Sequence, residues 1–403
     1  MTLAQPPGDA LRRIAVIGSG LAGLTAAHVA AKTAHVTLFE ADDRLGGHAD
    51  THQVGGLAID TGFIVHNERT YPTLLRIFAE LGVETQDSEM SLSVSDRETG
   101  VEYAGALGPR GLFPTARLLA DPAHLRMLAE IPRFHRRARA LLAAGADADQ
   151  TLGDFLAEHG FSASFVRHFA EPLVAAVWSC DPERAMAYPA AYLFTFLDHH
   201  GMLGVFGSPR WKTVVGGSGT YVAKVAAGLH DVRPGTKILG VAETSEGVEV
   251  TDGNGAVHRF DAVVIATHPD QALAMLTAPT AAQREVLGAM VYSANTAHLH
   301  TDTSLLPRAE AARASWNFLR PAGPGPSADA RPTDGAVTVT YDLTRLMRLP
   351  TRTHYLVTLG GGDLIDPDSV IDTMHYAHPL YTPQTLAAQR RLPDIETTRI
   401  AFA

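Results

Sequence analysis

The sequence predicts an α/β fold, α+β overall, in which two domains alternate along the chain. Three observations support this prediction. A strand–turn–helix unit opens the chain at 14–31, a mostly helical stretch follows from about 70 to 205, and apolar strands return between 236 and 267. Strands that alternate with helices are typical of a parallel sheet. Because a long helical stretch separates its strands, we expect the domain that holds this sheet to be discontinuous in sequence.

The first element is a buried strand, Ile14–Ile17, that runs directly into the glycine-rich turn Gly18–Gly23. Its first glycine makes the tight turn, Gly20 lets the backbone approach a pyrophosphate, and the last glycine lets a helix pack on the sheet. The N-terminus of that helix offers N–H groups and the positive end of its dipole to phosphates. A second apolar run ends at Glu40, which can accept hydrogen bonds from a ribose, whereas NADP sites favour a basic residue. This spacing predicts a Rossmann-like dinucleotide-binding unit.

The same stretch superficially resembles a targeting segment, because Arg12–Arg13 precedes uncharged residues from Ile14 to Ala31. Its glycines fall on the nucleotide-binding spacing, however, and no small-residue cleavage site precedes Lys32. The single cysteine, Cys180, excludes an intrachain disulfide and fits a reducing compartment, and we interpret it as a buried structural thiol. We therefore expect a soluble, cytoplasmic protein.

The charge of the chain, −10 at neutral pH, argues against a nucleic-acid partner. Four arginines between 133 and 139 are interpreted as a solvated helix face, with contact to an acidic or lipid head group as the alternative. The chain holds 19 histidines, but none lies in a metal-binding spacing such as HExxH, so we expect no metal. The expected partner is a small molecule, with peripheral membrane contact left open.

The middle of the chain is predicted to be mostly helical. Tyr71–Leu81 has apolar residues at helix spacing and Gly82 is a good stop, whereas Ser91–Ser95 alternates as a strand does. Further amphipathic stretches are expected to form helices; they cover 118–143, 151–159, 163–178 and 190–198.

Beyond the helical stretch, the sheet is predicted to resume. A second glycine-rich turn at 216–219 leads into a helix over 222–229, and an alternating pattern then predicts strands at 236–242, 247–251 and 256–260. Asp261–Thr267 is apolar on both faces, as an interior parallel strand must be. A proline- and glycine-rich segment, 321–335, is expected to be a surface loop.

This order suggests how the two domains divide. We assign 1–70, 207–283 and 375–403 to the dinucleotide-binding domain, and 71–206 and 284–374 to a substrate domain of helices and an antiparallel or mixed sheet. The dinucleotide-binding half of a simple nicotinamide dehydrogenase is usually contiguous. The interleaved order therefore favours a flavoprotein.

Several motifs resemble those of the FAD-dependent amine oxidase and phytoene desaturase-like superfamily. Glu40–Gly47 resembles its E-x-x-x-R-x-G-G motif, and Asp60–Phe63 its D-x-G segment. Gly62–Pro72, Trp211–Ser218 and His298–Asp302 are similar to one subgroup, predicted oxidoreductases linked with cyclopropane fatty-acid synthesis. The resemblance extends over nearly the whole chain and is less specific for a substrate.

The resemblance implies FAD as the cofactor. It places the pyrophosphate at the first glycine turn, the adenosine ribose at Glu40 and Arg44, the flavin ring beside the backbone at 62–64, and the adenine at Ile238. The implied cofactor-binding residues are Gly18, Ser19, Gly20, Leu21, Ala22, Gly23, Glu40, Arg44, Gly47, His48, Gly62, Phe63, Ile64, Ile238 and Thr267.

Two features depart from the superfamily pattern. His48 stands where amine oxidases carry an arginine that meets a phosphate, and imidazole is the weaker anion partner. The chain also ends at Ala403, where a glycine-rich segment that approaches the flavin is expected to begin. We therefore expect either a fragment, a truncated natural form or a protein that lacks part of its flavin site.

The expected activity is hydride transfer from a substrate C–H bond to the flavin, as in a desaturase or dehydrogenase of a fatty-acyl or isoprenoid-like substrate. No residue is identified as catalytic; His66 and Asn67 are candidates for the mouth of the active site. Aromatic residues are candidates for the substrate wall, although most are expected to be ordinary core: Phe165, Phe169, Trp178, Tyr192, Phe194, Phe196, Phe206 and Trp316. The alternatives are a flavin amine oxidase and a non-catalytic flavin-binding or partner subunit.

Overall fold

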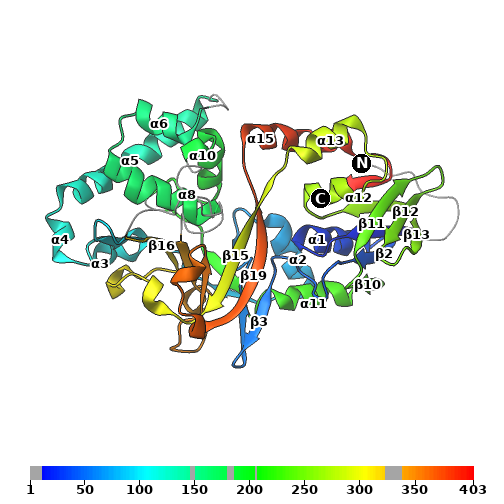
Figure 1. The fold of residues 1–403 in the computed structure, drawn as a ribbon, viewed down its shortest axis with the longest axis horizontal. Coiled ribbons are helices and arrows are strands. Elements are labelled where there is room, and N and C mark those ends of the chain that lie inside the picture. The colour runs from blue at the N-terminus through cyan, green and yellow to red at the C-terminus, as the bar shows by residue number, and fades with distance from the viewer. Residues whose placement is uncertain (1–10, 146–149, 179–185, 205–206, 323–337) are drawn as a thin grey trace.

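The computed structural model describes residues 11–145, 150–178, 186–204, 207–322 and 338–403. Figure 1 shows a lobe of helices on one side and a lobe built around a parallel sheet on the other, with two long strands running between them. Cys180 and Phe206 lie outside the described residues, as do most of the loop expected at 321–335 and the side chain of Trp178.

A five-stranded parallel sheet, with strand order β10-β2-β1-β14-β20, forms the centre of the second lobe. Its strands are β1 (Arg12–Ile17), β2 (Ala34–Phe39), β10 (Asp231–Arg233), β14 (Ala262–Ile265) and β20 (Ile400–Phe402). Val16 pairs with both Leu38 and Val264, and all the pairings are parallel. β14 lies between β1 and β20, which confirms the interior strand predicted for this segment.

The helix α1 (Leu21–Ala30) follows β1 through the predicted glycine turn. Gly18 has a φ of +97°, and a Cβ atom there would lie 2.6 Å from the carbonyl oxygen of Ala266. A Cβ at Gly23 would overlap the carbonyl oxygen of Gly18. These two positions therefore require glycine for the backbone conformation and for the close approach of helix and turn.

Smaller sheets and helices surround the parallel sheet. An antiparallel sheet contains β11 (Ile238–Glu243), β12 (Val248–Asp252) and β13 (Val257–Phe260), which confirms the predicted hairpin. A two-stranded antiparallel sheet outside the parallel sheet pairs β3 (Thr51–Val54) with β4 (Leu57–Asp60). The third small sheet holds β5 (Val65–Asn67), β6 (Thr85–Asp87) and β9 (Trp211–Val214). The helices here are α2 (Pro72–Leu81), α11 (Gly219–Ala227), α12 (Pro269–Met275), α13 (Ala281–Gly288) and α15 (Pro383–Arg390).

A seven-stranded mixed sheet, with strand order β19-β15-β18-β17-β16-β7-β8, connects the lobes. Its strands are β7 (Leu92–Asp96), β8 (Val101–Ala104), β15 (Tyr292–His300), β16 (Trp316–Arg320), β17 (Thr338–Asp342), β18 (Leu356–Leu359) and β19 (Val370–Pro379). β16 and β7 are parallel, and the other pairs are antiparallel. β15 and β19 pair along their whole length and are the two strands that run between the lobes in Figure 1.

The helical lobe is organised around an aromatic core. Its helices are α3 (Gly108–Leu112), α4 (Ala116–Leu119), α5 (Pro122–Ala143), α6 (Leu152–Glu158), α7 (Ala163–Phe165), a π-helical turn (Val166–Ala170), α8 (Glu171–Trp178) and α10 (Ala190–His199). α5 begins later than predicted because the Asp121 side chain caps it, accepting hydrogen bonds from the N–H groups of Ala123 and His124. Phe165 and Phe194 are fully buried in this core, so neither lines a substrate site.

The remaining elements are short. They are α14 (Leu343–Leu346) and 3₁₀ turns at Gly105–Leu107, Thr303–Leu305, Glu310–Ala312, Gly362–Leu364, Pro367–Ser369 and Leu392–Ile395. Within the described ranges, no helix has the length and apolar character needed to cross a bilayer. The assignment of residue ranges to the two domains stays a prediction.

Candidate functional site

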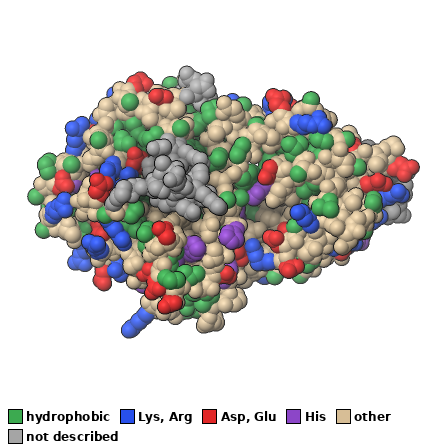
Figure 2. All heavy atoms as spheres, in the orientation of Figure 1, with side chains coloured by type: hydrophobic (Ala, Val, Ile, Leu, Met, Phe, Trp, Pro, Cys, Tyr) green, Lys and Arg blue, Asp and Glu red, His purple; other side chains and the backbone are tan. Residues whose placement is uncertain are grey.

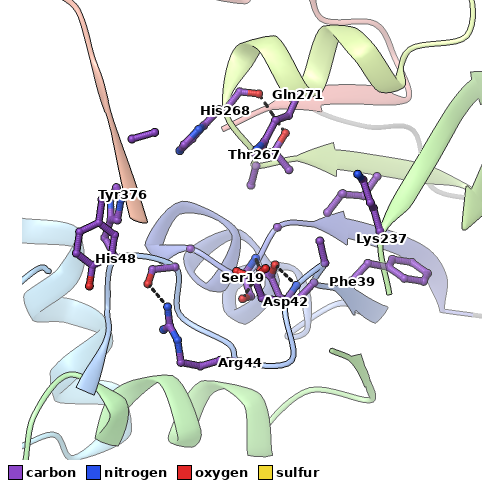
Figure 3. Close-up of a pocket in the computed structure, with 18 of the residues that line it drawn as sticks. Ser19, Phe39, Asp42, Arg44, His48, Lys237, Thr267, His268, Gln271 and Tyr376 are labelled. Atoms are coloured by element: carbon purple, nitrogen blue, oxygen red, sulfur yellow. Dashed lines mark hydrogen bonds between the residues drawn. The ribbon is translucent and has the colours of Figure 1, made fainter. Parts of the chain in front are cut away.

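A cavity of about 1250 Å³ lies beside the carboxyl ends of β1, β2 and β14. This is the edge of a parallel α/β sheet at which ligands bind. The volume exceeds the usual 300–1,000 Å³ or so of a pocket for one small ligand, and it suits a dinucleotide. Figure 3 shows the residues around it, with His48 and Tyr376 at one end and Phe39 and Lys237 at the other.

The glycine turn after β1 lies along the wall of this cavity, from Gly18 to Leu21. A Cβ atom on Gly20 would meet no other residue within 4 Å, so the open space of the cavity begins at its backbone. Gly47 closes the other side, because a Cβ there would lie 3.1 Å from the Cα of Gly20. The bare backbone and the N-terminus of α1 together fit a diphosphate.

Glu40 also lines the cavity, at the end of β2. Its carboxylate accepts hydrogen bonds from the backbone N–H of Ser19 at 2.8 Å and from that of Asp42 at 3.0 Å, and the Ser19 hydroxyl donates to it at 2.5 Å. These bonds hold the carboxylate beside the glycine turn. Its remaining lone pairs can accept further hydrogen bonds, and the role of Glu40 in binding the ribose stays a prediction.

Arg44 lines the same cavity and stabilises the loop beneath it. Its guanidinium donates to the carbonyl oxygens of Gly47 at 2.9 Å and Ala49 at 3.3 Å, and its Nε lies 3.3 Å from a carboxylate oxygen of Asp50. The side chain is therefore already engaged by its own loop. Its contribution is to shape the wall as well as to supply charge.

The end predicted to hold the adenine is formed by β11 and the residues just before it. Lys237, Ile238 and Leu239 line the cavity here, and Phe39 and Thr267 face them. The Ile238 side chain is 6% exposed, so its place in this wall is fixed by packing. The apolar side chains among these residues offer a surface against which the flat face of an adenine is predicted to lie.

The opposite end carries aromatic and imidazole side chains. His48 contacts Tyr376 edge-to-face at a ring distance of 4.8 Å, and His268 stacks on Tyr292 at 4.1 Å. Phe63 lines this end as well. Apolar ring faces and polar ring edges therefore surround the space where the flavin is predicted to lie.

Asp50 is a mostly buried carboxylate that belongs to the cavity wall at this end. It accepts a hydrogen bond from the Tyr376 hydroxyl at 2.9 Å, and the imidazole of His52 approaches it to 3.4 Å. Burial raises the pKa of Asp50, but the interactions with His52 and Arg44 outweigh burial and lower that pKa. The same pairing raises the pKa of His52. Asp50 thus stays ionised, and it orients Tyr376 at the cavity.

Asp60, in the D-x-G segment, holds neighbouring parts of the chain together through its carboxylate. Its carboxylate accepts the N–H of Ser218 at 2.8 Å and the hydroxyl of Thr51 at 2.5 Å, which fastens the second glycine turn to β4. These bonds also explain why α11 begins three residues before the predicted helix. Burial raises the pKa of Asp60 to about 6.

Most of the predicted cofactor-binding residues meet at the cavity. The cavity wall contains Gly18, Ser19, Gly20, Leu21, Glu40, Arg44, Gly47, His48, Phe63, Ile238 and Thr267. Four others are outside this wall: Ala22, Gly23, Gly62 and Ile64. Gly23 and Gly62 act one layer behind it, since a Cβ on Gly62 would overlap the carbonyl oxygen of His48.

The expectation that His66 and Asn67 border the mouth of the site is wrong. The two side chains are 1% and 0% exposed, and neither lines the cavity. His66 packs edge-to-face on Phe78, and burial lowers its pKa to about 4. The Asn67 side chain accepts hydrogen bonds from Arg69 and Thr70 and shapes its own turn.

Several cavity residues were not predicted. His268, Tyr292 and Tyr376 belong to this group, together with Lys237 and Gln271. His268 directly follows Thr267, a predicted cofactor-binding residue, so its neighbour in the sequence was a signal for it. The tyrosines come from strands whose path is visible only in the fold.

Comparisons with known proteins identify the family to which this chain belongs. The chain matches the family described as flavin containing amine oxidoreductase over residues 21–373, and it belongs to that family. It is 29% identical over 259 residues to the putative flavin-containing monoamine oxidase AofH of Mycobacterium tuberculosis, which covers 60% of this chain and 54% of that protein. It is 27% identical over 176 residues to protoporphyrinogen oxidase 2 of Arabidopsis thaliana, with coverage of 43% and 34%.

The fold is shared with solved structures. The crystal structure of a fatty acid isomerase from P. acnes that produces CLA matches with a TM-score of 0.68 and 16% identity, and the match covers 97% of this chain and 93% of that one. At this identity the likeness shows the fold alone. The chain spans about half the length of the monoamine oxidase it matches (54%) and about a third (34%) of the protoporphyrinogen oxidase.

Family membership confirms three predictions: the amine oxidase-like superfamily, the fold class and FAD as the cofactor. The link to cyclopropane fatty-acid synthesis stays a prediction. Among the residues that the structure describes, no group of three or more histidine, cysteine or acidic side chains is arranged to hold a metal ion.

Proposed function

We propose that this chain is an FAD-dependent oxidoreductase that removes a hydride from a C–H bond of a lipophilic, fatty-acyl or isoprenoid-like substrate. The observation that carries the proposal is the cavity itself, where the bare backbone of Gly20 and the anchored carboxylate of Glu40 lie side by side. Bound FAD would supply the hydride acceptor at its N5 atom. The protein's part is to hold the dinucleotide, orient the substrate and exclude water.

An aromatic path supports a lipophilic substrate. From Phe63 in the cavity wall, ring contacts continue to Tyr71 at 5.8 Å and to His200 at 6.3 Å. His200 in turn stacks on Phe196 at 4.0 Å and on Trp211 at 5.9 Å. These rings are only partly buried. A half-exposed aromatic wall next to a cofactor cavity favours an apolar ligand over a charged one.

A flavin amine oxidase is the second candidate. Such an enzyme needs an aromatic pair beside the flavin to guide the amine, and Tyr292 and Tyr376 both line the cavity at the end predicted to hold the flavin ring. The monoamine oxidase relative supports the same interpretation. A single experiment separates the two candidates.

That experiment is an anaerobic titration of the FAD-loaded protein with unsaturated or methylated acyl lipids and, separately, with primary amines. Loss of the visible flavin absorbance on adding an acyl lipid, but not an amine, supports the first proposal. Bleaching by amines alone supports the second. Bound flavin that no substrate reduces contradicts both and leaves a non-catalytic flavin-binding subunit.

We also propose a cytoplasmic location with peripheral contact to anionic membranes. Arg136 and Arg137 on α5 are exposed and have no acidic partner in the described part of the chain. Such side chains suit anionic lipid head groups. Co-sedimentation with phosphatidylserine vesicles, but not with phosphatidylcholine vesicles, is the expected result. Equal recovery with both would contradict the proposal of membrane contact.

A further inference from the structure

Three histidines from separate segments meet at the flavin end of the cavity. His48 follows Gly47, His268 precedes α12, and His378 lies near the end of β19. His48 and His268 line the cavity, and the ring of His378 meets that of His48 edge-to-face at 5.8 Å. Figure 3 shows His48 and His268 on facing sides of the open space. We call these three residues the imidazole cluster.

The ring nitrogens of the imidazole cluster have no hydrogen-bond partner within the described residues. Two other half-buried histidines of this chain, in contrast, have hydrogen-bond partners. The ring of His200 bonds the carbonyl oxygen of Phe196 at 2.8 Å, and that of His354 bonds Asp342 at 2.8 Å. Polar atoms that face a cavity without a protein partner are available to a ligand.

The cluster flanks the glycine turn from two directions. Gly47, which precedes His48, packs against Gly20. Thr267, which precedes His268, packs against Gly18, because a Cβ atom on Gly18 would lie 3.2 Å from the methyl carbon of Thr267. The two imidazoles therefore approach the position that the turn and the N-terminus of α1 prepare for a diphosphate.

The described charged groups near the imidazole cluster form no hydrogen bonds with its ring nitrogens, so these nitrogens can bind an anion. On its own loop His48 faces Arg44 and Asp50, and Asp50 is already bound by that arginine and by Tyr376. His268 faces Asp270 on α12 and stacks on the ring of Tyr292. Apart from these groups and the two rings themselves, no charged group of the described residues shifts the pKa of His48 or His268.

In the absence of a ligand the imidazoles are held neutral. Burial lowers the pKa of His48, and the neighbouring His268 and Arg44 lower it further. Burial also lowers the pKa of His268, and burial together with the other two rings lowers that of His378 to about 4. An anion placed between the rings would act in the opposite direction and favour the protonated form.

We propose that His48 and His268 bind the diphosphate of FAD, with His378 supporting His48, and that the imidazole cluster takes up a proton as the cofactor binds. The proposal rests on the proposed function. An arginine is always charged and would attract the diphosphate equally at every physiological pH. Histidine is charged only after it takes a proton. Cofactor affinity in this chain therefore increases as the pH falls.

The test is a titration of cofactor-free protein with FAD at about pH 6 and at about pH 8, in which flavin fluorescence measures the binding. Uptake of one proton strengthens binding by up to about tenfold per pH unit, so we expect at least about fivefold tighter binding at the lower pH. Calorimetry in two buffers of different ionisation heat counts the protons taken up. In a His48→Gln/His268→Gln double variant the pH dependence and the proton uptake are expected to disappear.

Two single variants complete the test. His48→Arg is expected to bind FAD with a weaker pH dependence than the wild type, because its charge is permanent. His230→Gln changes an exposed histidine away from the cavity and is expected to behave as the wild type. Circular dichroism at both pH values checks that each variant is folded.

The outcomes separate the two proposals. Wild-type affinity that changes less than about fivefold, or FAD binding without proton uptake, would overturn the role of the imidazole cluster. Proton uptake that persists in the double variant would overturn it as well. If the double variant does not fold, the wild-type proton count and the His48→Arg titration decide. Protein that binds no FAD at either pH contradicts the proposed function instead.

Discussion

Replacing Gly20 by alanine separates cofactor binding from folding. Gly20 has φ −60° and ψ 175°, an extended conformation that alanine adopts freely, and its new methyl group would meet no other residue within 4 Å. The methyl group would stand in the cavity, where the backbone is predicted to contact the diphosphate. We expect FAD affinity to fall at least about tenfold, which corresponds to about 1.4 kcal/mol.

The stability of the cofactor-free protein is expected to stay unchanged or to rise by about 0.4–1 kcal/mol, because alanine reduces the freedom of the unfolded chain. Gly23→Ala is the matched comparison. Its methyl group would overlap the carbonyl oxygen of Gly18, so the turn and the helix must separate. Overpacking of this kind costs about 1–3 kcal/mol. Gly23→Ala is therefore expected to lower both stability and affinity.

Flavin fluorescence titration measures the affinity of each variant, and urea unfolding of the cofactor-free protein measures its stability. Wild-type affinity in Gly20→Ala would show that the dinucleotide does not lie on this turn. A large loss of stability in the same variant would show that the space beside Gly20 is smaller than the structure indicates.

Two further predictions concern charge. Glu40→Gln is expected to weaken FAD binding by roughly 1.5–3 kcal/mol, because a charged acceptor that Ser19 positions is lost; unchanged affinity in calorimetry would place the ribose elsewhere. Acid is expected to destabilise the fold. Burial lowers the pKa of His66, His135 and His300 to about 4 in the folded protein. Between about pH 6.5 and pH 4, therefore, these histidines take up protons only in the unfolded chain, and protonation favours unfolding. Asp60 acts in the opposite direction, since its folded pKa of about 6 lies above its ordinary value, and one such group offsets only part of the loss.

The acid effect has a measurable size. Each histidine pKa is shifted by about two and a half pH units, which lowers the free energy of unfolding by roughly 3 kcal/mol when the pH has fallen below both pKa values. The single carboxyl group of Asp60 raises the free energy of unfolding by a similar amount. Urea unfolding at about pH 5 is therefore expected to give a free energy of unfolding at least about 2 kcal/mol below that at about pH 7. Equal stability at the two pH values would show that these histidines titrate normally in the folded protein.

The nucleotide-binding unit was predictable because its signals are local. Each of its patterns can be recognised from a few consecutive residues: the turn Gly18–Gly23, the acid at Glu40 and the apolar segment at 261–267. The structure has a strand, a turn and a helix, and an interior strand, at the predicted positions. Helix ends were less predictable. The start of α5 depends on a cap at Asp121, and that of α11 on the distant carboxylate of Asp60.

The flavin end of the site was harder to predict because distant segments build it. The ring contacts of His48 with Tyr376 and His378 join residues more than three hundred positions apart, and neither partner is marked by a motif. His66 was misplaced for a related reason. β5 pairs with β9, and the imidazole then turns inward onto Phe78. Sequence spacing does not show which face of such a short strand is covered.

The central claim is that the cavity beside β1, β2 and β14 holds one FAD molecule. Its most direct test is an equilibrium titration of the purified chain with FAD, read as the number of molecules bound per chain, with Gly20→Ala beside it. We predict saturation at one FAD per chain for the wild type and markedly weaker binding for the variant. A wild-type chain that leaves all added FAD free in solution would contradict the claim.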